Sequence, residues 1–245
     1  MRIVLPPSET KQLGGETGST LDWAALAHAE LTSVREGIAA DLIAVSSDDA
    51  SGLKALGLGA KGAEWLEANK QLESSPVMPA ISRYTGVVFD ALDYSTLDEA
   101  GVRSAHESLW LFSALFGPVW ATDMIPRYRL SFDSKLPGEP LKKRWQPYAE
   151  AMWRGDFVVD LRSEGYRALA PLPGGCGVYV RVVKDLSGGV AAGHANKTTK
   201  GRFVRSIVAS GERFTNGADL LTWAAGHGFE MAPGAEGELL LAVVD

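Results

Sequence analysis

Cysteine is almost absent from this chain, which has one cysteine and four histidines among its 245 residues. The single thiol, Cys176, cannot form an internal disulfide, so nothing indicates an oxidising compartment, and no cysteine–histidine set has zinc-site spacing. No segment approaches the roughly 18 consecutive apolar residues that a membrane helix needs. The N-terminus has only a very short apolar run before Pro6-Pro7, unlike a secretory signal. We therefore expect a cytoplasmic protein with no membrane segment.

Several signatures of common enzymes are also missing. The sequence contains no G-x-x-x-x-G-K-[ST] phosphate loop, no G-x-G-x-x-G dinucleotide turn and no G-x-S-x-G nucleophile elbow. Basic residues number 24 against 30 acidic ones, and this formal charge of -6 argues weakly against a nucleic-acid binder, which usually has a basic excess. Local clustering can override that argument, because the field inside a cleft depends on the charges nearest to it.

The remaining composition, 46% apolar and 22% charged, is that of an ordinary globular protein. Apolar runs and turn signals predict strands at residues 2–5, 87–89, 156–161 and 239–244, and a strand hairpin from 178–183 to 189–192. Helical spacing predicts helices at about 22–45, 96–107, 141–153, 196–210 and 218–225. Strands and helices alternate without a regular βαβ period. We expect one domain, residues 1–245, of mixed α/β (α+β) type with a central mixed β-sheet flanked by helices.

The stretch from residue 112 to 132, FSALFGPVWATDMIPRYRLSF, is the first candidate for a functional element. It starts apolar, breaks at Gly117-Pro118 and Pro126, and then presents Arg127, Tyr128 and Arg129 in succession. Proline fixes its own φ and moves the preceding residue out of the helical region. The stretch thus predicts a buried element that runs into an ordered, cation-bearing loop, where binding residues concentrate. The alternative is a buried strand whose turn leaves both arginines in water.

A second candidate is the pattern L-x-x-L-G-L-G-x-x-x-A-x-x-L at residues 53–66. Two short helices joined at Gly57-Leu58-Gly59 would produce it, within a helix-hairpin-helix-like segment at about 49–70. Glycines there can adopt positive φ and leave backbone N–H groups free for a phosphate. The proline usual before the first glycine is missing, since Leu56 stands there. The alternative is an ordinary helical hairpin with glycine as a C-cap.

Basic residues recur at several places in this acidic chain. They are Lys11, Arg83, Arg127, Arg129, Lys197, Lys200, Arg202 and Arg205. The last four follow Asn196, a predicted N-cap, and cations in the first turns of a helix oppose its dipole. That placement costs stability unless an anion binds there; the alternative is a charged, exposed helix. His194 lies beside this set and is the ligand candidate if a metal or haem is bound. Cys176 is either a reactive thiol or an ordinary loop cysteine.

Five ordered segments together resemble a known family. They are IVLPPSETK (3–11), RYTGVVFDAL (83–92), FSALFGPVWATDMIPRYRLS (112–131), VVDLRSEGY (158–166) and GHANKTTKGRFVR (193–205). They resemble the signatures of the YaaA family of peroxide-stress proteins, and LPGEPLKKRW (136–145) is similar to its branch in high-GC Gram-positive bacteria. The resemblance covers the chain essentially from end to end. It implies a single α/β domain with a positively charged cleft, double-stranded DNA binding without strong sequence preference, and a role in lowering free iron.

Three positions depart from the family pattern. Trp120-Ala121 stands where Arg-Pro is usual, Thr10 where glycine precedes the first lysine, and Ala195 where a large residue follows the histidine. Losing a cation and gaining an indole would weaken phosphate binding and open space for a flat or small ligand. Some biosynthetic relatives look like haem-dependent oxygenases that hydroxylate nitrogen, so these departures keep an enzyme hypothesis open.

Three hypotheses follow. The first is a cytoplasmic stress protein without a cofactor that binds the DNA backbone, or another anion, through the eight basic residues above and the turn at Gly57 and Gly59. The second is a haem-dependent enzyme in the same cleft, with His194 and Trp120 near the chemistry. The third is a structural or interaction protein whose basic groups pair with its own acids. The sequence assigns no catalytic residue and no oligomeric state.

Overall fold

The computed structural model describes residues 1–191 and 193–244. Its strands are β1 (Arg2–Leu5), β2 (Met78–Pro79), β3 (Leu109–Ser113), β4 (Gly117–Trp120), β5 (Met124–Ile125), β6 (Val158–Asp160), β7 (Gly177–Asp185), β8 (Gly188–Val190), β9 (Met231–Pro233) and β10 (Glu238–Ala242). One sheet has the order β4-β3-β1-β6-β7-β10-β9, with β8 paired to β7, and β2 pairs with β5 in a separate ribbon. The prediction of a mixed sheet within one α/β domain is confirmed.

The middle of the sheet is parallel. Strand β1 pairs in parallel with β3 and β6, and β6, β7 and β10 continue that direction. The outer strands β4 and β9, and the short β8, are antiparallel. Strands covered on both faces contain continuous apolar runs, and LWLFS of β3 is buried at every residue. The carboxyl ends of β1 and β6 therefore lie side by side at one edge.

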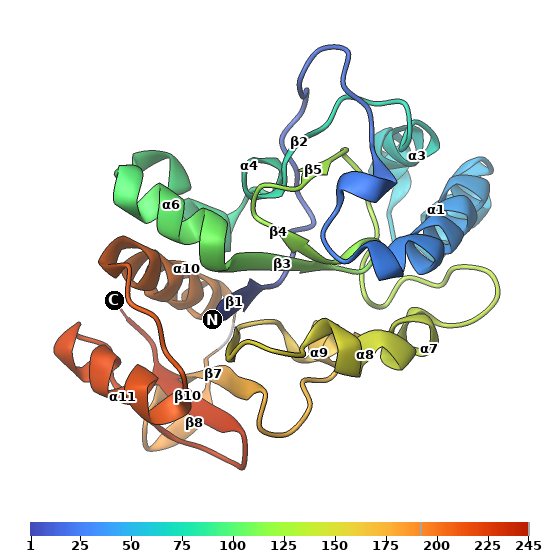
Figure 1. Ribbon diagram of the computed structural model, residues 1–245. Coiled ribbons are helices and arrows are strands. Elements are labelled where there is room, and N and C mark those ends of the chain that lie inside the picture. Colours follow the sequence, from blue (N-terminus) through green and yellow to red (C-terminus); the bar gives the residue numbers. More distant parts are fainter. Residues whose placement is uncertain (192, 245) are drawn as a thin grey trace.

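The helices are α1 (Thr32–Ser46), α2 (Asp49–Ala55), α3 (Ala63–Lys70), α4 (Ala80–Arg83), α5 (Val87–Leu92), α6 (Glu99–Ser108), α7 (Leu141–Trp145), α8 (Ala149–Met152), α9 (Glu164–Leu169), α10 (Gly193–Ser210) and α11 (Gly217–Gly226). Figure 1 shows α6 and α10 running beside each other along the sheet, with α1 and α3 grouped at the other side of the molecule. None of the helices in the described part of the chain is long and apolar enough to cross a bilayer.

Most predicted elements are present at nearly the predicted residues. Helix α6 matches the helix expected at 96–107, α11 matches 218–225, and β10 matches 239–244. The hairpin expected from 178–183 to 189–192 is the β7–β8 pair, although Ala192 lies outside the described residues. The helix expected at 141–153 is present as α7 and α8 joined by a short 3-10 turn.

Three predicted elements differ from the structure. The strand expected at 87–89 is wrong, because Val87–Leu92 is helical and packs against α10. The helix expected from residue 22 begins only at Thr32, after two 3-10 turns and a left-handed His28 with φ 60°. The N-cap predicted at Asn196 is also wrong, since α10 begins at Gly193 and the Asn196 amide donates to the Ala191 carbonyl at 3.2 Å.

Close packing of α10 on α5 places the first turns of α10. A Cβ atom at Gly201 would overlap the carbonyl oxygen of Val88 and lie 2.6 Å from Cβ of Ala91. A side chain at this position would push the two helices apart. Glycine is therefore required here by the approach of backbone to backbone.

Gly201→Ala should lower the free energy of unfolding by about 1–3 kcal/mol, because the overlap outweighs the better helix propensity of alanine. The matched control is Gly37→Ala in α1, where nothing lies within 4 Å of an added Cβ. That control should gain about 0.5–1 kcal/mol. Urea denaturation of both variants measures the difference, and equal gains in the two would contradict the packing argument.

Candidate anion-binding cleft

A cleft of about 450 Å³ lies outside the carboxyl ends of β1 and β6. Its wall is built by residues 6–10 after β1, residues 85–89 at the start of α5, and Phe132. Its other side is built by α9 and its preceding residue and by the first turns of α10. From these helices come Ser163, Tyr166, Asn196, Lys197 and Lys200.

The sheet order explains why a cleft forms at this edge. Strands β1 and β6 are neighbours in the sheet. The next strand of the sheet after β1 is β3, which lies next to β1 on the side away from β6, and the next strand after β6 is β7, which lies next to β6 on the side away from β1. The two connections therefore leave the sheet in opposite directions and part above the neighbouring carboxyl ends. Ligands of parallel α/β sheets bind at such a divergence.

Of the two lysines that line the cleft, Lys200 is buried and Lys197 is exposed. Lys200 is 5% exposed, and its Nζ donates one long hydrogen bond of 3.4 Å to the carbonyl of Arg162. Burial lowers the pKa of Lys200 to about 8, although the nearby Asp160 carboxylate acts in the opposite direction. Lys200, Ser163 and Asn196 also line an adjoining hollow of about 450 Å³ beside Tyr179 and Arg181. The amine thus lies at the junction of two hollows.

A buried ion pair fixes the loop that carries the carbonyl partner of Lys200. Arg162 donates from Nε and Nη2 to the two carboxylate oxygens of Asp160, at 2.9 and 2.8 Å, and both side chains are fully buried. The guanidinium lies 4.6 Å from the ring centroids of both Phe112 and Trp153. This bidentate pair holds the chain rigidly where β6 ends.

Three hydroxyl groups cluster on the opposite wall. Ser8 Oγ lies 3.2 Å from Thr10 Oγ1, and Thr85 Oγ1 donates to Thr10 Oγ1 at 3.1 Å. Gly86 passes next to them with φ 96°, and an added Cβ would lie 3.3 Å from the Thr10 hydroxyl. Thr10 therefore places a hydroxyl inside the cleft.

A second basic cluster lies beside the cleft, around Trp65 of α3. It contains Lys11, Arg127 and Arg129, whose cationic groups lie 5.9, 3.9 and 6.0 Å from a Trp65 ring centroid. Lys11 Nζ donates to the Ser8 carbonyl at 2.9 Å. Burial first, and then the charge of Arg129, hold the pKa of Lys11 well below its usual value. The structure thus brings Lys11, Arg127 and Arg129 together.

Each arginine of this cluster has an acidic partner. Arg129 pairs with Glu9 at 2.8 Å, and Glu9 also lines the cleft, so this ion pair joins the cluster to the cleft. Arg127 pairs with Glu64 of α3 at 3.1 Å. These pairs fit the third hypothesis, in which basic groups are balanced by the chain's own acids.

Arg83 corrects the sequence prediction. The sequence predicts that it neutralises a phosphate, but Arg83 is fully buried and donates to the carbonyls of Ile125, Gln12, Gly14 and Pro76 at 2.6–3.1 Å. Its guanidinium joins three backbone segments, at residues 12–14, 76 and 125, and is shielded from any ligand in solvent. Arg83 is therefore a structural residue.

Arg202 and Arg205 are likewise engaged with the protein. Arg205 donates to the carbonyls of Leu92 and Asp93 at 2.9 and 2.6 Å, and to the Thr96 hydroxyl at 2.9 Å. Arg202 donates to the Val244 carbonyl at 3.2 Å. Neither residue lines the cleft.

The turn at Gly57–Gly59 lies between α2 and α3. Gly57 adopts φ 63°, as a C-cap glycine does, and its N–H donates to the Lys54 carbonyl at 3.3 Å. The prediction of a free N–H at Gly57 is therefore wrong, and the capping alternative describes this glycine. Contact of the Gly59 region with nucleic acid stays a prediction.

The two residues of the haem hypothesis do not meet. His194 is exposed in the first turn of α10, where Nδ1 lies 3.2 Å from the Thr198 hydroxyl, and it does not line the cleft. Trp120, at the end of β4, packs edge-on against Trp110 with ring centroids 4.5 Å apart. Ala121 beside it is fully buried. The expectation that Trp120-Ala121 opens the cleft is wrong, because these residues belong to the core beside the sheet's edge.

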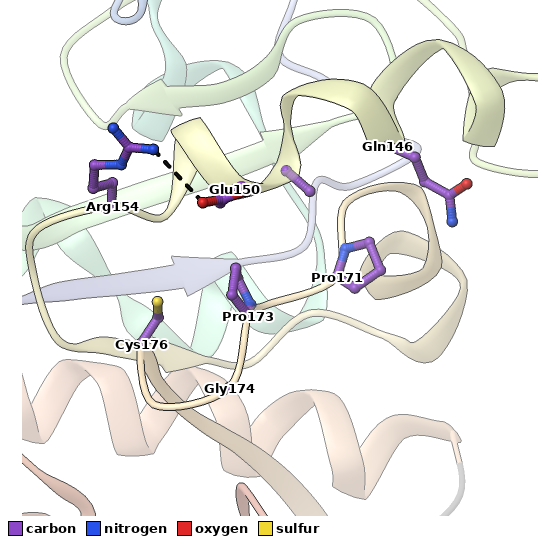
Figure 2. Close-up of a pocket in the computed structure, with 8 residues that line it drawn as sticks. Gln146, Glu150, Arg154, Pro171, Pro173, Gly174 and Cys176 are labelled. Atoms are coloured by element: carbon purple, nitrogen blue, oxygen red, sulfur yellow. Dashed lines mark ion pairs between the residues drawn. The ribbon is translucent and has the colours of Figure 1, made fainter.

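Cys176 lines another hollow, of about 610 Å³, which is shown in Figure 2. The figure shows Arg154 and Glu150 joined by an ion pair, at 3.7 Å, on one side and Pro171, Pro173 and Cys176 on the other. Both charged partners are mostly exposed, and the cysteine is only partly buried. We place the candidate site in the cleft, where buried and exposed cations, hydroxyl groups and an aromatic ring line one volume.

Sequence reasoning missed the aromatic and hydroxyl part of the cleft. Phe132 and Tyr166 line it, and they are the last residues of two segments quoted above for other reasons. The available signal was an apolar residue, Phe132, directly after a polar, cation-bearing loop.

Comparison with known proteins places the chain in a family. Residues 1–233 match the family model described as peroxide stress protein YaaA. A UPF0246 protein of Corynebacterium glutamicum is 42% identical over 252 residues, which cover 99% of this chain and 100% of that protein. A UPF0246 protein of Corynebacterium efficiens is 41% identical over 254 residues, 99% of this chain and 100% of its own. One of Streptomyces coelicolor is 37% identical over 239 residues, 94% and 92% of the two chains. The resemblance found in the sequence is confirmed.

Proposed function

This chain belongs to the peroxide stress protein YaaA family, and from that premise we propose that it serves peroxide defence in the cytoplasm by binding a small anionic ligand in the cleft. The ligand's anionic group would lie against Lys197 and Lys200. A cleft of about 450 Å³ has the size of pockets that enclose small molecules.

The observation that carries this proposal is the burial of Lys200. An ammonium group has three donors, and this one has a single hydrogen bond, of 3.4 Å, at a position that is 5% exposed. Burying a charged amine with so little compensation is unfavourable, as its lowered pKa indicates. An anion in the cleft would supply both the charge and the acceptors, and the nearby N-terminus of α10 would favour it further.

NMR titration of the full chain with inorganic phosphate and pyrophosphate tests the proposal. We expect the amide signals of residues 8–10, 163–166 and 194–201 to shift together and to saturate. Competition by salt should weaken the effect, because part of the attraction is electrostatic. The proposal fails if these signals do not move, or if only exposed lysines elsewhere respond.

The DNA backbone is a second candidate for the anion. Its support is the position of Lys197 on the exposed part of the cleft and of Arg127 and Arg129 next to it. The partners of these arginines, Glu64 and Glu9, are mostly exposed carboxylates that phosphates could replace.

The role in lowering free iron belongs to this candidate as well, and free iron measured in cells lacking the protein would test it.

Fluorescence anisotropy with two unrelated DNA duplexes tests the second candidate. Phosphate neutralisation releases counterions, so binding at about 50 mM salt should exceed binding at about 200 mM at least tenfold, equally for both sequences. Absent binding, or binding indifferent to salt, removes DNA and leaves the small anion. Adding the small anion in competition shows whether the two share the cleft.

A haem role does not fit the residues in place. His194 is exposed, is bonded to Thr198 and lies outside the lining of the cleft, and Trp120 packs against Trp110. Adding haem to the purified protein should produce no Soret band beyond that of free haem.

A further inference from the structure

The cleft contains an exposed aromatic ring besides its amines. Phe132 is 39% exposed, and it is one of few large apolar side chains in the described part of the chain that are open to solvent. Its ring lines the cleft and meets Tyr166 edge-on, with ring centroids 5.2 Å apart. An exposed aromatic ring in a cleft is a surface on which a flat group can stack.

The position of the Phe132 ring is fixed by its contact with helix α9. A Cβ atom at Gly165 of α9 would overlap the ring of Phe132. The ring therefore rests directly on the backbone of α9, with Tyr166 as its neighbour. A ring held in this way needs little ordering when a ligand stacks on it, which favours binding.

Three kinds of group thus surround one volume of about 450 Å³. Lys197 and Lys200 offer positive charge, Phe132 offers a ring face, and the hydroxyl cluster described above offers polar contacts. A molecule that uses all three has an anionic group, a flat ring and a polar part. Nucleoside phosphates have this composition.

We propose that the ligand of the cleft is a nucleoside phosphate, with its base stacked on Phe132 and its phosphate against Lys197 and Lys200. This inference rests on the proposed function, of which it names the ligand class. Sugar and base edges would meet the hydroxyl groups of Ser8 and Thr10. Stacking on an aromatic side chain tolerates any base, because every base has a π face.

Calorimetric titration with matched ligands tests this inference. A panel of the four nucleoside monophosphates is compared with ribose 5-phosphate, which lacks the base, and with the free nucleosides, which lack the phosphate. The wild-type chain should bind at least one monophosphate about tenfold more tightly than ribose 5-phosphate, a difference of about 1.4 kcal/mol. Free nucleosides should bind more weakly than their monophosphates.

The Phe132→Leu variant measures the contribution of the aromatic ring to binding. It should weaken the monophosphate about tenfold and leave ribose 5-phosphate unchanged. Gly165→Ala, which displaces the ring, should act in the same direction. Leu186→Ala is the control, because Leu186 is 38% exposed and does not line the cleft. Since Phe132 is partly exposed, its replacement by leucine should leave the fold intact, as circular dichroism would verify.

The outcomes separate this inference from the function on which it rests. If ribose 5-phosphate binds as tightly as every monophosphate, or Phe132→Leu has no effect, the stacking role is overturned. The anion cleft then still stands, provided that Lys200→Met removes ribose 5-phosphate binding. If no phosphate compound binds to the wild-type chain, both proposals fail.

Discussion

Lys200→Met should raise the free energy of unfolding at about pH 7 by up to about 3 kcal/mol, and weaken anion binding strongly. The stability gain follows from the pKa of Lys200, which burial lowers from an ordinary 10.5 to about 8. Between these values the unfolded chain binds more protons than the folded chain, so the stability of the wild type rises with pH. Below about pH 8 the folded chain holds a charged, buried amine, and its full cost is present. Methionine has similar length and no charge.

Urea denaturation across the pH range measures the first effect. The stability advantage of Lys200→Met should be largest near neutral pH and shrink as the pH rises from about 8 towards 10.5. The comparison variant is Lys197→Met, which removes an exposed lysine from the same helix and should change stability by less than about 0.5 kcal/mol. A Lys200→Met protein that is less stable than the wild type at neutral pH would show that the amine is stabilised by the protein itself.

The binding effect of the same variant should also be large. Removing one member of a buried charge pair typically costs 2–5 kcal/mol, so we expect anion affinity to fall about a hundredfold. Lys197→Met should weaken binding less, because an exposed charge is screened by water and salt. A gain in stability together with a loss of binding would identify Lys200 as a residue kept for its ligand.

Asp160→Asn should destabilise the protein by about 3–5 kcal/mol, because it leaves the fully buried Arg162 guanidinium without its carboxylate. The substitution keeps the shape of the side chain and removes only its charge. It should also disturb the loop whose carbonyl accepts the Lys200 hydrogen bond, and so weaken anion binding indirectly.

The control for this prediction is an exposed ion pair elsewhere in the chain. Glu150 and Arg154 lie 3.7 Å apart with both side chains mostly exposed, and Glu150→Gln should change stability by less than about 1 kcal/mol. Chemical denaturation of the two variants at one pH makes the comparison. Similar losses in both would mean that burial of the Asp160–Arg162 pair has no special energetic role.

The parts of the fold that the sequence predicted are those with strong local signals. Short apolar runs bounded by prolines or glycines gave β1 and β10, and turn residues gave the β7–β8 hairpin. The prediction of a strand at residues 87–89 was wrong because the sequence Val-Val-Phe favours a strand locally. Their helical form depends on packing against α10 at Gly201, a contact across more than a hundred residues that a local pattern does not contain.

The sequence predicted only part of the candidate site, because tertiary packing decides which of the basic residues reach the cleft. Lys197 and Lys200 reach the cleft, while Lys11, Arg127 and Arg129 gather beside it. Arg83 does neither. A sequence shows that a residue is cationic, but whether its donors face a ligand or four backbone carbonyls is decided by the tertiary structure. The exposure of the Phe132 ring could not be predicted either, because it also depends on the tertiary structure.

The most direct test of an anion cleft at Lys200 is the affinity for sulfate, whose charge is constant, measured by NMR at about pH 7 and about pH 9. If the charged amine holds the anion, wild-type affinity should fall about tenfold between these values, since Lys200 passes through its pKa of about 8. Lys200→Met should bind weakly and equally at both. Equal sulfate affinity at the two pH values in the wild type, unchanged by Lys200→Met, would contradict the account.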